Sequence, residues 1–303
     1  MWRAAAGGFL LSAAAVAAGA PAGDCRVPSL KVEASSPRPR QGEIVAVTLE
    51  SSVPLASAKL SDGKHTAAME RDSTAGGRVL HVLWGVDFES SLGARRVRVE
   101  ARGLCGDAHG AAWDLKVASG RFPEQKLTVD PAYVEPPPSE KERIERERAE
   151  VGRVWAAAPT ARRWSEGFRL PVDAPLRPNF GAKRVFNGQP RSRHNGVDLA
   201  APPGAPVTAP AAGTVVLAEE MYFSGGTVIL DHGGGLFTTY FHLSRIDVKA
   251  GDRAAAGARI GAVGATGRAT GPHLHWGARL HGARVNPLDL LKLPRWAPSS
   301  PEQ

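Results

Sequence analysis

Short runs in which apolar and polar residues alternate recur along most of this 303-residue chain, and they strongly constrain its fold. Between residues 26 and 120 such runs are separated by Gly, Pro and Asp-Gly breaks. They are LKVEA, EIVAVTLES, ASAKLSDGK, RVLHVLWGV, RRVRVEARG and AAWDLKVAS. Alternation with a period of two is typical of strands that bury one face. The pattern predicts an Ig-like antiparallel β-sandwich for this half of the chain.

The C-terminal half also predicts strands rather than helices. It is rich in glycine, and its strand-like runs are APVTAPAAGTVVLAEE, GTVILDHGG, LFTTYFHLS and ARIGAVGAT. No helical period of useful length occurs between Gly181 and Val285. We therefore expect an all-β protein with two domains, since 303 residues suffice for two separate cores.

A charged segment between the two halves predicts the single helix. Three prolines at 136–138 interrupt any preceding strand, and Ser139 with Glu142 has the spacing of a capping box. Apolar residues then fall near one stripe, which predicts a solvent-facing helix of about 15–20 residues packed by one narrow face. The stripe consists of Ile144, Val151 and Trp155. The predicted division is a signal peptide at 1–22, a β-sandwich at 25–130, a Pro-rich and helical linker at 131–167, a second β-domain at 168–293 and a tail at 294–303.

The N-terminus has the order of residues found in secretory signal peptides. Arg3 precedes an apolar, Ala-rich run, and small residues follow at 19–23. Cleavage after Ala20 or Ala22 would fit, and an uncleaved anchor is the alternative. No other run has the length and purity of a membrane-spanning helix. We expect an exported protein without stable membrane insertion after processing.

The two cysteines, Cys25 and Cys105, predict one disulfide in an exported chain. In the chain-entropy model, closing a loop of this length stabilises the fold by roughly 4–5 kcal/mol. The alternative is a pair of free thiols in a cytosolic protein. The net charge of +8 does not predict nucleic-acid binding, because the basic residues are scattered and no recognition helix or aromatic platform accompanies them.

The first candidate site lies in SRHNGVDLAAP. If this segment is one strand, His194, Gly196 and Asp198 point to one face, and Val197 and Leu199 point to the core. The glycine then leaves room above the sheet for an ion. A histidine and an aspartate four residues apart are a weak signal alone, because a wet strand face produces the same pair.

Two further segments carry histidines at the same two-residue period. In GPHLHWG, His273 and His275 share a face, with apolar residues behind them. In YFHLS, the same count places His242 on the face of Tyr240 and turns Phe241 to the core. Three strands would then present polar groups on one side of a rigid sheet, which suits a preorganised site.

Together, these side chains have the chemistry of a zinc site. Outside thiolate sites zinc prefers imidazole and carboxylate ligands, and catalytic zinc keeps three protein ligands and an open position. Five candidate side chains exceed what one such ion can use. Some of them must therefore act outside the metal's ligand set, and the spacing alone does not say which.

The motifs HNGVDLAAPPGAPV, YFHLS and GPHLHWGARL, in this order, resemble the signature of the lysostaphin/LytM-type zinc metalloendopeptidases. The resemblance covers roughly residues 170–293. It implies that His194, Asp198 and His275 bind one Zn²⁺, and that His242 and His273 stay off the metal with catalytic roles. Which of these two is the base remains open. The order of sandwich, helix and catalytic domain is similar to exported members from Gram-negative bacteria, which implies a location in the periplasm or cell envelope.

This resemblance implies a zinc-dependent endopeptidase that hydrolyses peptide bonds in peptidoglycan stem peptides or cross-links. The alternative is a non-catalytic LytM-type regulator that binds peptidoglycan or activates a cell-wall amidase. A zinc-free adhesin would leave the histidines unexplained. We expect peptidoglycan as the partner, no nucleic acid, and a monomer. The sandwich domain could bind the wall, bind a partner or shield the cleft.

Overall fold

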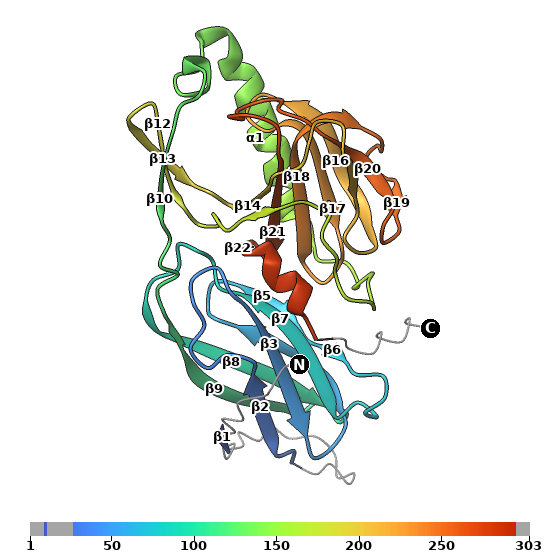
Figure 1. The fold of residues 1–303 in the computed structure, drawn as a ribbon. Coiled ribbons are helices and arrows are strands. Elements are labelled where there is room, and N and C mark those ends of the chain that lie inside the picture. Colours follow the sequence, from blue (N-terminus) through green and yellow to red (C-terminus); the bar gives the residue numbers. More distant parts are fainter. Residues whose placement is uncertain (1–8, 11–26, 295–303) are drawn as a thin grey trace. The chain divides into compact units, whose positions relative to one another are not determined.

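The structure, a computed structural model, describes residues 9–10 and 27–294 (Figure 1). Most regular elements among the described residues are strands, joined by a single α-helix and short 3₁₀ turns, which confirms the predicted all-β fold. By their internal contacts they form two compact units, one ending at residue 119 and the other spanning 120–293. Most of the predicted signal peptide, and Cys25, lie outside the described residues. Within the described ranges, no helix is long and apolar enough to cross a membrane.

The N-terminal unit is a sandwich of two antiparallel sheets. One sheet has the order β1-β2-β3-β7-β6 and the other β5-β4-β8-β9. Side chains from both sheets, such as Val47 and Val99, pack in one buried cluster between them. Each of the predicted strands is present. Two further strands, β5 and β6, were not predicted, because they are too short to show an alternation of apolar and polar residues. The strands are β1 (Phe9–Leu10), β2 (Leu30–Ala34), β3 (Ile44–Ser51), β4 (Leu55–Ser61), β5 (Thr66–Ala68), β6 (Glu70–Arg71), β7 (Val79–Gly85), β8 (Gly93–Gly103) and β9 (Ala108–Val117).

The C-terminal unit contains a large antiparallel sheet and a small one. The large sheet follows the order β11-β14-β21-β18-β17-β16-β19, with β15, β20 and β22 attached to it, and the small sheet is β10-β12-β13. Its strands are β10 (Glu124–Leu127), β11 (Leu176–Arg177), β12 (Lys183–Phe186), β13 (Gln189–Arg193), β14 (Gly196–Leu199), β15 (Pro206–Thr208), β16 (Gly213–Met221), β17 (Gly225–Asp231), β18 (Leu236–Ile246), β19 (Arg253–Ala254), β20 (Arg259–Val263), β21 (Leu274–Leu280) and β22 (Ala283–Val285). The helices are η1 (Pro131–Tyr133), η2 (Pro138–Glu140), α1 (Lys141–Ala156) and η3 (Pro287–Lys292).

The segment predicted as a linker is part of the C-terminal unit. Strand β10 pairs in parallel with β12, so the chain joins this unit from residue 120 and not after 130. The Pro-rich stretch is also held, because Tyr222 donates a hydrogen bond from Oη to the Ala132 carbonyl (2.8 Å). The boundary between the units lies earlier than the sequence predicted, because β10 pairs with a strand nearly 60 residues away. The local alternation of apolar and polar residues does not indicate such a pairing.

Helix α1 lies beside β16 and packs by one face, as the apolar stripe predicted (Figure 1). Val151, Val154 and Trp155 contact a buried cluster on the sheet. The Trp155 ring meets Phe237 edge-on, with ring centroids 5.4 Å apart. The helix therefore covers apolar sheet surface rather than bridging two free domains.

The predicted capping box is wrong. The N-cap of α1 is Glu140, which has helical backbone angles, and no side chain caps the helix. Ser139 lies inside the preceding turn η2, which runs directly into α1. Glu142 pairs instead with Arg146 one turn later, with 3.0 Å between Arg146 Nη1 and Glu142 Oε1. A 3₁₀ turn that merges into the helix removes the extended residue that a capping box requires.

Candidate metal centre

The structure brings His194, Asp198 and His275 together in the C-terminal unit. Asp198 on β14 lies directly opposite His275 on β21. The atoms His194 Nε2, Asp198 Oδ1 and His275 Nδ1 form a triangle with sides of 2.7, 3.1 and 3.3 Å. All three residues are buried, with exposed fractions of 1%, 7% and 3%. A triangle of this size around buried nitrogen and oxygen donors is what a single small cation requires.

The strand assumed for SRHNGVDLAAP is interrupted. β13 ends at Arg193 and β14 begins at Gly196, so His194 lies in the break between two strands. Its Nδ1–H donates to the Asn179 carbonyl (3.0 Å), which directs Nε2 towards Asp198. Contact with a neighbouring loop, and not strand alternation, therefore orients this ring.

The donor set fits a metal ion on electrostatic grounds. Burial raises the pKa of Asp198, but its contacts with His194 and His275 outweigh burial and hold the pKa well below its usual range. Burial lowers the pKa of His194 and lowers that of His275 to about 3, so both rings are neutral. Asp198 Oδ1 is buried and has no hydrogen-bond partner in the described part of the chain. An ionised carboxylate with an unsatisfied oxygen beside two neutral imidazoles fits zinc.

Asn179 supports this centre, and the sequence reasoning missed it. It lies just after β11, which pairs with β14. Its Nδ2 donates to Asp198 Oδ2 (2.6 Å), and its Oδ1 accepts the Asp198 backbone N–H (3.2 Å). Together with the bond from His194, it thus makes three contacts to two candidate ligands. Such outer partners orient ligands and tune them. An isolated asparagine in a loop carries no sequence motif that could have revealed this role.

Arg184 on β12 is the second residue that the sequence reasoning missed. Its Nη2 lies 3.3 Å from Asp198 Oδ2 and donates to it. Burial lowers the pKa of Arg184, and the charge of Asp198 partly offsets that effect. The small sheet thus contributes to the centre through one long side chain.

The predicted faces of β18 are wrong because the strand contains a bulge. Val228 pairs with Tyr240 and Gly226 with Leu243, so two β18 residues oppose one β17 residue between these pairs. The second of the two is His242, whose φ of 65° is in the left-handed region. A bulge of this kind interrupts the alternation of faces and re-aims a side chain.

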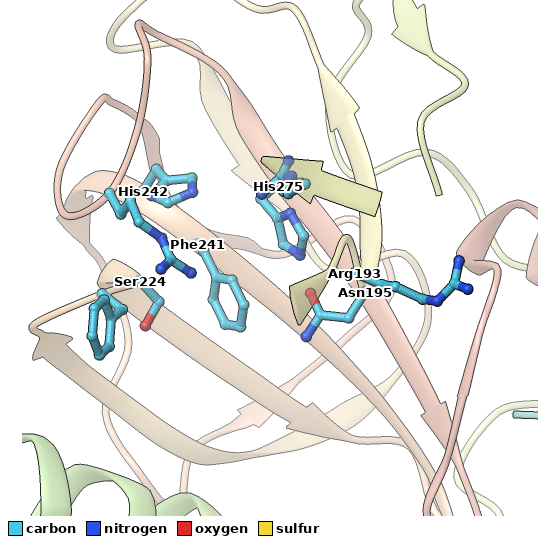
Figure 2. A pocket seen from close by; sticks show the side chains of 9 residues that line it. Arg193, Asn195, Ser224, Phe241, His242 and His275 are labelled. Atoms are coloured by element: carbon cyan, nitrogen blue, oxygen red, sulfur yellow. The ribbon is translucent and has the colours of Figure 1, made fainter. Parts of the chain in front are cut away.

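The bulge exchanges the expected positions of two aromatic residues. Tyr240 lies opposite Trp276 in the core, where both are fully buried. Phe241 lies opposite His275 instead, and the two rings stack with centroids 4.9 Å apart and planes 3° from parallel. His242 and Phe241, adjacent in sequence, therefore both lie beside His275 (Figure 2).

His242 and His273 form a second pair of rings beside the centre, with centroids 4.9 Å apart. Nδ1–H of His242 donates to the Thr266 carbonyl (2.8 Å), and Nδ1–H of His273 donates to the Gly271 carbonyl (2.7 Å). Carbonyl oxygens only accept, so these bonds require a proton on Nδ1 of each ring. His273 Nε2 is 3.6 Å from Asp198 Oδ1. Burial lowers the pKa of His242 to about 4.

Two cavities open beside these side chains. The larger, of about 140 Å³, is lined among others by Asn195, Phe241, His242 and His275 (Figure 2). The smaller, of about 60 Å³, is lined in part by Asp198 and His273. His242 borders both cavities.

The remaining described histidines are not among the side chains that converge at the candidate centre. His65, His81 and His109 belong to the N-terminal unit. His232 is fully buried, and its Nδ1–H donates to the Ala212 carbonyl (2.8 Å). His281 has a positive φ of 48° in the turn between β21 and β22.

Comparison with known proteins identifies the family. The model of Peptidase family M23 matches residues 192–287, a range that contains both histidine motifs and His242. A crystal structure from Pseudomonas aeruginosa, described as a peptidase M23, is 32% identical and covers 84% of this chain and 95% of its own, with a TM-score of 0.64. The chain belongs to peptidase family M23. The resemblance seen in the sequence is thereby confirmed.

Among curated proteins, this M23 chain resembles enzymes with larger chains. It is 42% identical over 121 residues to the peptidoglycan DD-endopeptidase ShyA of Vibrio cholerae, a match that covers 39% of this chain and 28% of ShyA. It is 43% identical over 97 residues to the DD-carboxypeptidase/endopeptidase Mpg of Neisseria meningitidis, which covers 32% of this chain and 22% of Mpg. The matched stretch therefore spans less than a third of either relative.

Proposed function

We propose that this protein is a zinc-dependent endopeptidase that hydrolyses peptide bonds in peptidoglycan stem peptides or cross-links. The observation that carries the proposal is the convergence of His194 Nε2, Asp198 Oδ1 and His275 Nδ1 beside a cavity that His242 also lines. The name of the curated relative ShyA supports peptidoglycan as the substrate class, and the names of both curated relatives support endopeptidase activity.

In this proposal the three converging side chains hold one zinc ion. When bound, zinc supplies a Lewis acid that lowers the pKa of water and polarises a carbonyl group. His242 and His273 move protons at Nε2, because Nδ1 of each ring is already bonded to a backbone carbonyl. One of them accepts the proton of the attacking water at Nε2. The other, when it also carries a proton at Nε2, donates a hydrogen bond to the carbonyl oxygen as that oxygen becomes negative.

The backbone bonds to Nδ1 also fix the two rings, so that their Nε2 atoms need no reorientation during the reaction. Phe241 stacks on His275 and shields one face of that ring from water. Asn179 and Arg184 hold Asp198 through Oδ2 and leave Oδ1 for the metal. The chain thus supplies a rigid, largely buried support for the reaction.

The test measures zinc content and digestion of purified sacculi, with products identified by mass spectrometry. His194→Ala and Asp198→Ala should lose both zinc and cleavage, and His242→Ala should keep zinc while losing turnover. His65→Ala, a half-exposed histidine in the N-terminal unit, is the control and should match the wild type. Digestion at the wild-type rate by His275→Ala would refute the assignment. Absence of zinc from the pure wild-type protein would instead favour a non-catalytic regulator.

We also propose that the protein is exported to the periplasm or cell envelope as a monomer, with its signal peptide cleaved and Cys25 bonded to Cys105. The signal-like N-terminus and the peptidoglycan-acting relatives support export. Mass spectrometry of the protein from cell envelopes, with and without reductant, would test the cleavage site and the disulfide. Light scattering would test the oligomeric state.

A further inference from the structure

Arg268 is a cation without a countercharge. It lies on the loop between β20 and β21, and its guanidinium is held between two aromatic rings, 4.7 Å from the centroid of Phe186 and 4.9 Å from that of Phe223. Its side chain makes no hydrogen bond or ion pair with any residue that the structure describes. Burial, with the nearby charges of Arg184 and Arg191, lowers the pKa of Arg268 to about 10. It remains protonated at neutral pH and is poorly compensated.

The two cavities beside the metal centre share this positive character. Among the described residues, the charged side chains that line the larger cavity are Arg184, Arg193 and Arg268. The smaller cavity adds Arg177 and has one acidic lining residue, Asp198, which is the candidate metal ligand. A metal cation at Asp198 would make the surroundings more positive still.

The arginines differ in how far the protein already uses them. Arg193 donates to the Gly181 carbonyl (3.1 Å) and stacks on Phe122, so its role is structural. Arg184 contacts Asp198 through Nη2, but its Nε is buried without a partner. Arg268 has donors on every edge and no acceptor among the residues that the structure describes. It thus presents unused donors beside the candidate metal centre, and Arg184 adds positive charge to both cavities.

We propose that Arg268, assisted by Arg184, binds a carboxylate of the substrate peptide next to the metal centre and so selects acidic peptides. This inference rests on the proposed function and names a specificity determinant for it. A guanidinium presents a planar fork that matches a carboxylate, and the two aromatic rings fix its plane before binding. A cavity of about 140 Å³ holds a group of side-chain size.

The experiment compares two synthetic cross-linked peptides that differ only in whether the carboxylate beside the scissile bond is free or amidated. A hydrogen bond to a charged group is worth ten- to roughly hundredfold in affinity. The zinc-loaded wild type should therefore cleave the free acid with a kcat/KM about ten- to hundredfold above the amide. Arg268→Met should lower this ratio to near one, and Arg268→Lys should retain part of it.

Arg279→Met is the matched control. Arg279 also stacks on an aromatic ring, Trp155 at 4.8 Å, but it lines neither cavity, so its variant should keep the wild-type ratio. Zinc content, measured for each variant, should not change. A preference for the acid that persists in Arg268→Met, or its absence from the wild type, would overturn the inference.

Binding measurements separate this inference from the proposed function. If the wild type cleaves neither peptide, the proposed function fails, but calorimetry with the same peptides still tests the subsite. The acid should bind about ten- to hundredfold tighter than the amide to the wild type, and equally to Arg268→Met. Equal binding of both peptides to the wild type refutes the subsite. A third peptide, amidated only at its C-terminus, distinguishes a side-chain carboxylate from a terminal one.

Discussion

Asn179→Ala tests whether the contacts around Asp198 prepare it for metal binding. The change removes the Nδ2 donor at 2.6 Å from Asp198 Oδ2 and the Oδ1 acceptor of the Asp198 N–H, but leaves the backbone carbonyl that orients His194. A hydrogen bond to a charged group contributes about 1.5–3 kcal/mol. The substitution removes this hydrogen bond from the metal-free protein as well as from the zinc-bound protein. Only the difference between the two losses therefore lowers the affinity for zinc. We expect zinc to bind about 10- to 100-fold more weakly, as for other outer partners of metal ligands.

The assay is a competition titration in which a chelating dye reports free zinc at fixed pH. Asn187→Gly is the control, because Asn187 also makes two side-chain hydrogen bonds, both to the Val129 backbone, and contacts no candidate ligand. Glycine accommodates its φ of 49° without strain. This variant should lose stability while binding zinc as tightly as the wild type. Zinc affinity of Asn179→Ala within threefold of the wild type would refute the reasoning.

Three further predictions concern packing, pH and the extent of the catalytic unit. Gly196→Ala should lower the free energy of unfolding by about 1–3 kcal/mol and weaken zinc binding, because the added Cβ would lie 2.7 Å from His275 Nε2. Gly152→Ala is the control, because a Cβ at this position in α1 meets no atom within 4 Å. In the same denaturation assay this variant should be more stable than the wild type by about 0.5–1 kcal/mol. Burial lowers the pKa of His232 to about 4. Wild-type stability should therefore fall by up to about 3 kcal/mol between pH 6.5 and pH 4, because the unfolded chain takes up the proton. The difference in free energy of unfolding between the wild type and His232→Gln should narrow over this range, and a difference that does not narrow would contradict the prediction. A fragment of residues 168–293 should melt below one of 120–293, because it lacks the β10 pairing and the helix that covers Phe237; equal melting temperatures would show that these elements add no stability.

Local patterns in the sequence anticipated much of the candidate centre. The pair His273 and His275 follows the two-residue period of a strand, and the structure puts their rings on the side of Asp198. Leu274 and Trp276 are fully buried behind them, as the alternation predicted. This two-residue alternation is readable in the sequence because it depends only on which side of the strand faces the core and which faces solvent.

For His242 and its neighbours, the prediction from strand alternation failed. The prediction placed it near the site but put Tyr240 beside it and turned Phe241 to the core, and the structure reverses those two positions. A β-bulge with a positive φ at a histidine depends on how β17 and β18 pair, which the residues of one strand do not specify.

By itself, the sequence determined the all-β class, nearly all strands of the sandwich, and the residues able to bind a metal, because alternation and ligand chemistry are local properties. Only the tertiary structure decided the partners of those residues. Asn179, Arg184 and Arg268 come from separate loops and strands, and β10 joins the C-terminal unit through a strand nearly 60 residues away. The physical reason is that pairing and burial between distant segments follow from the free energy of the whole packed unit, and no local pattern records that choice.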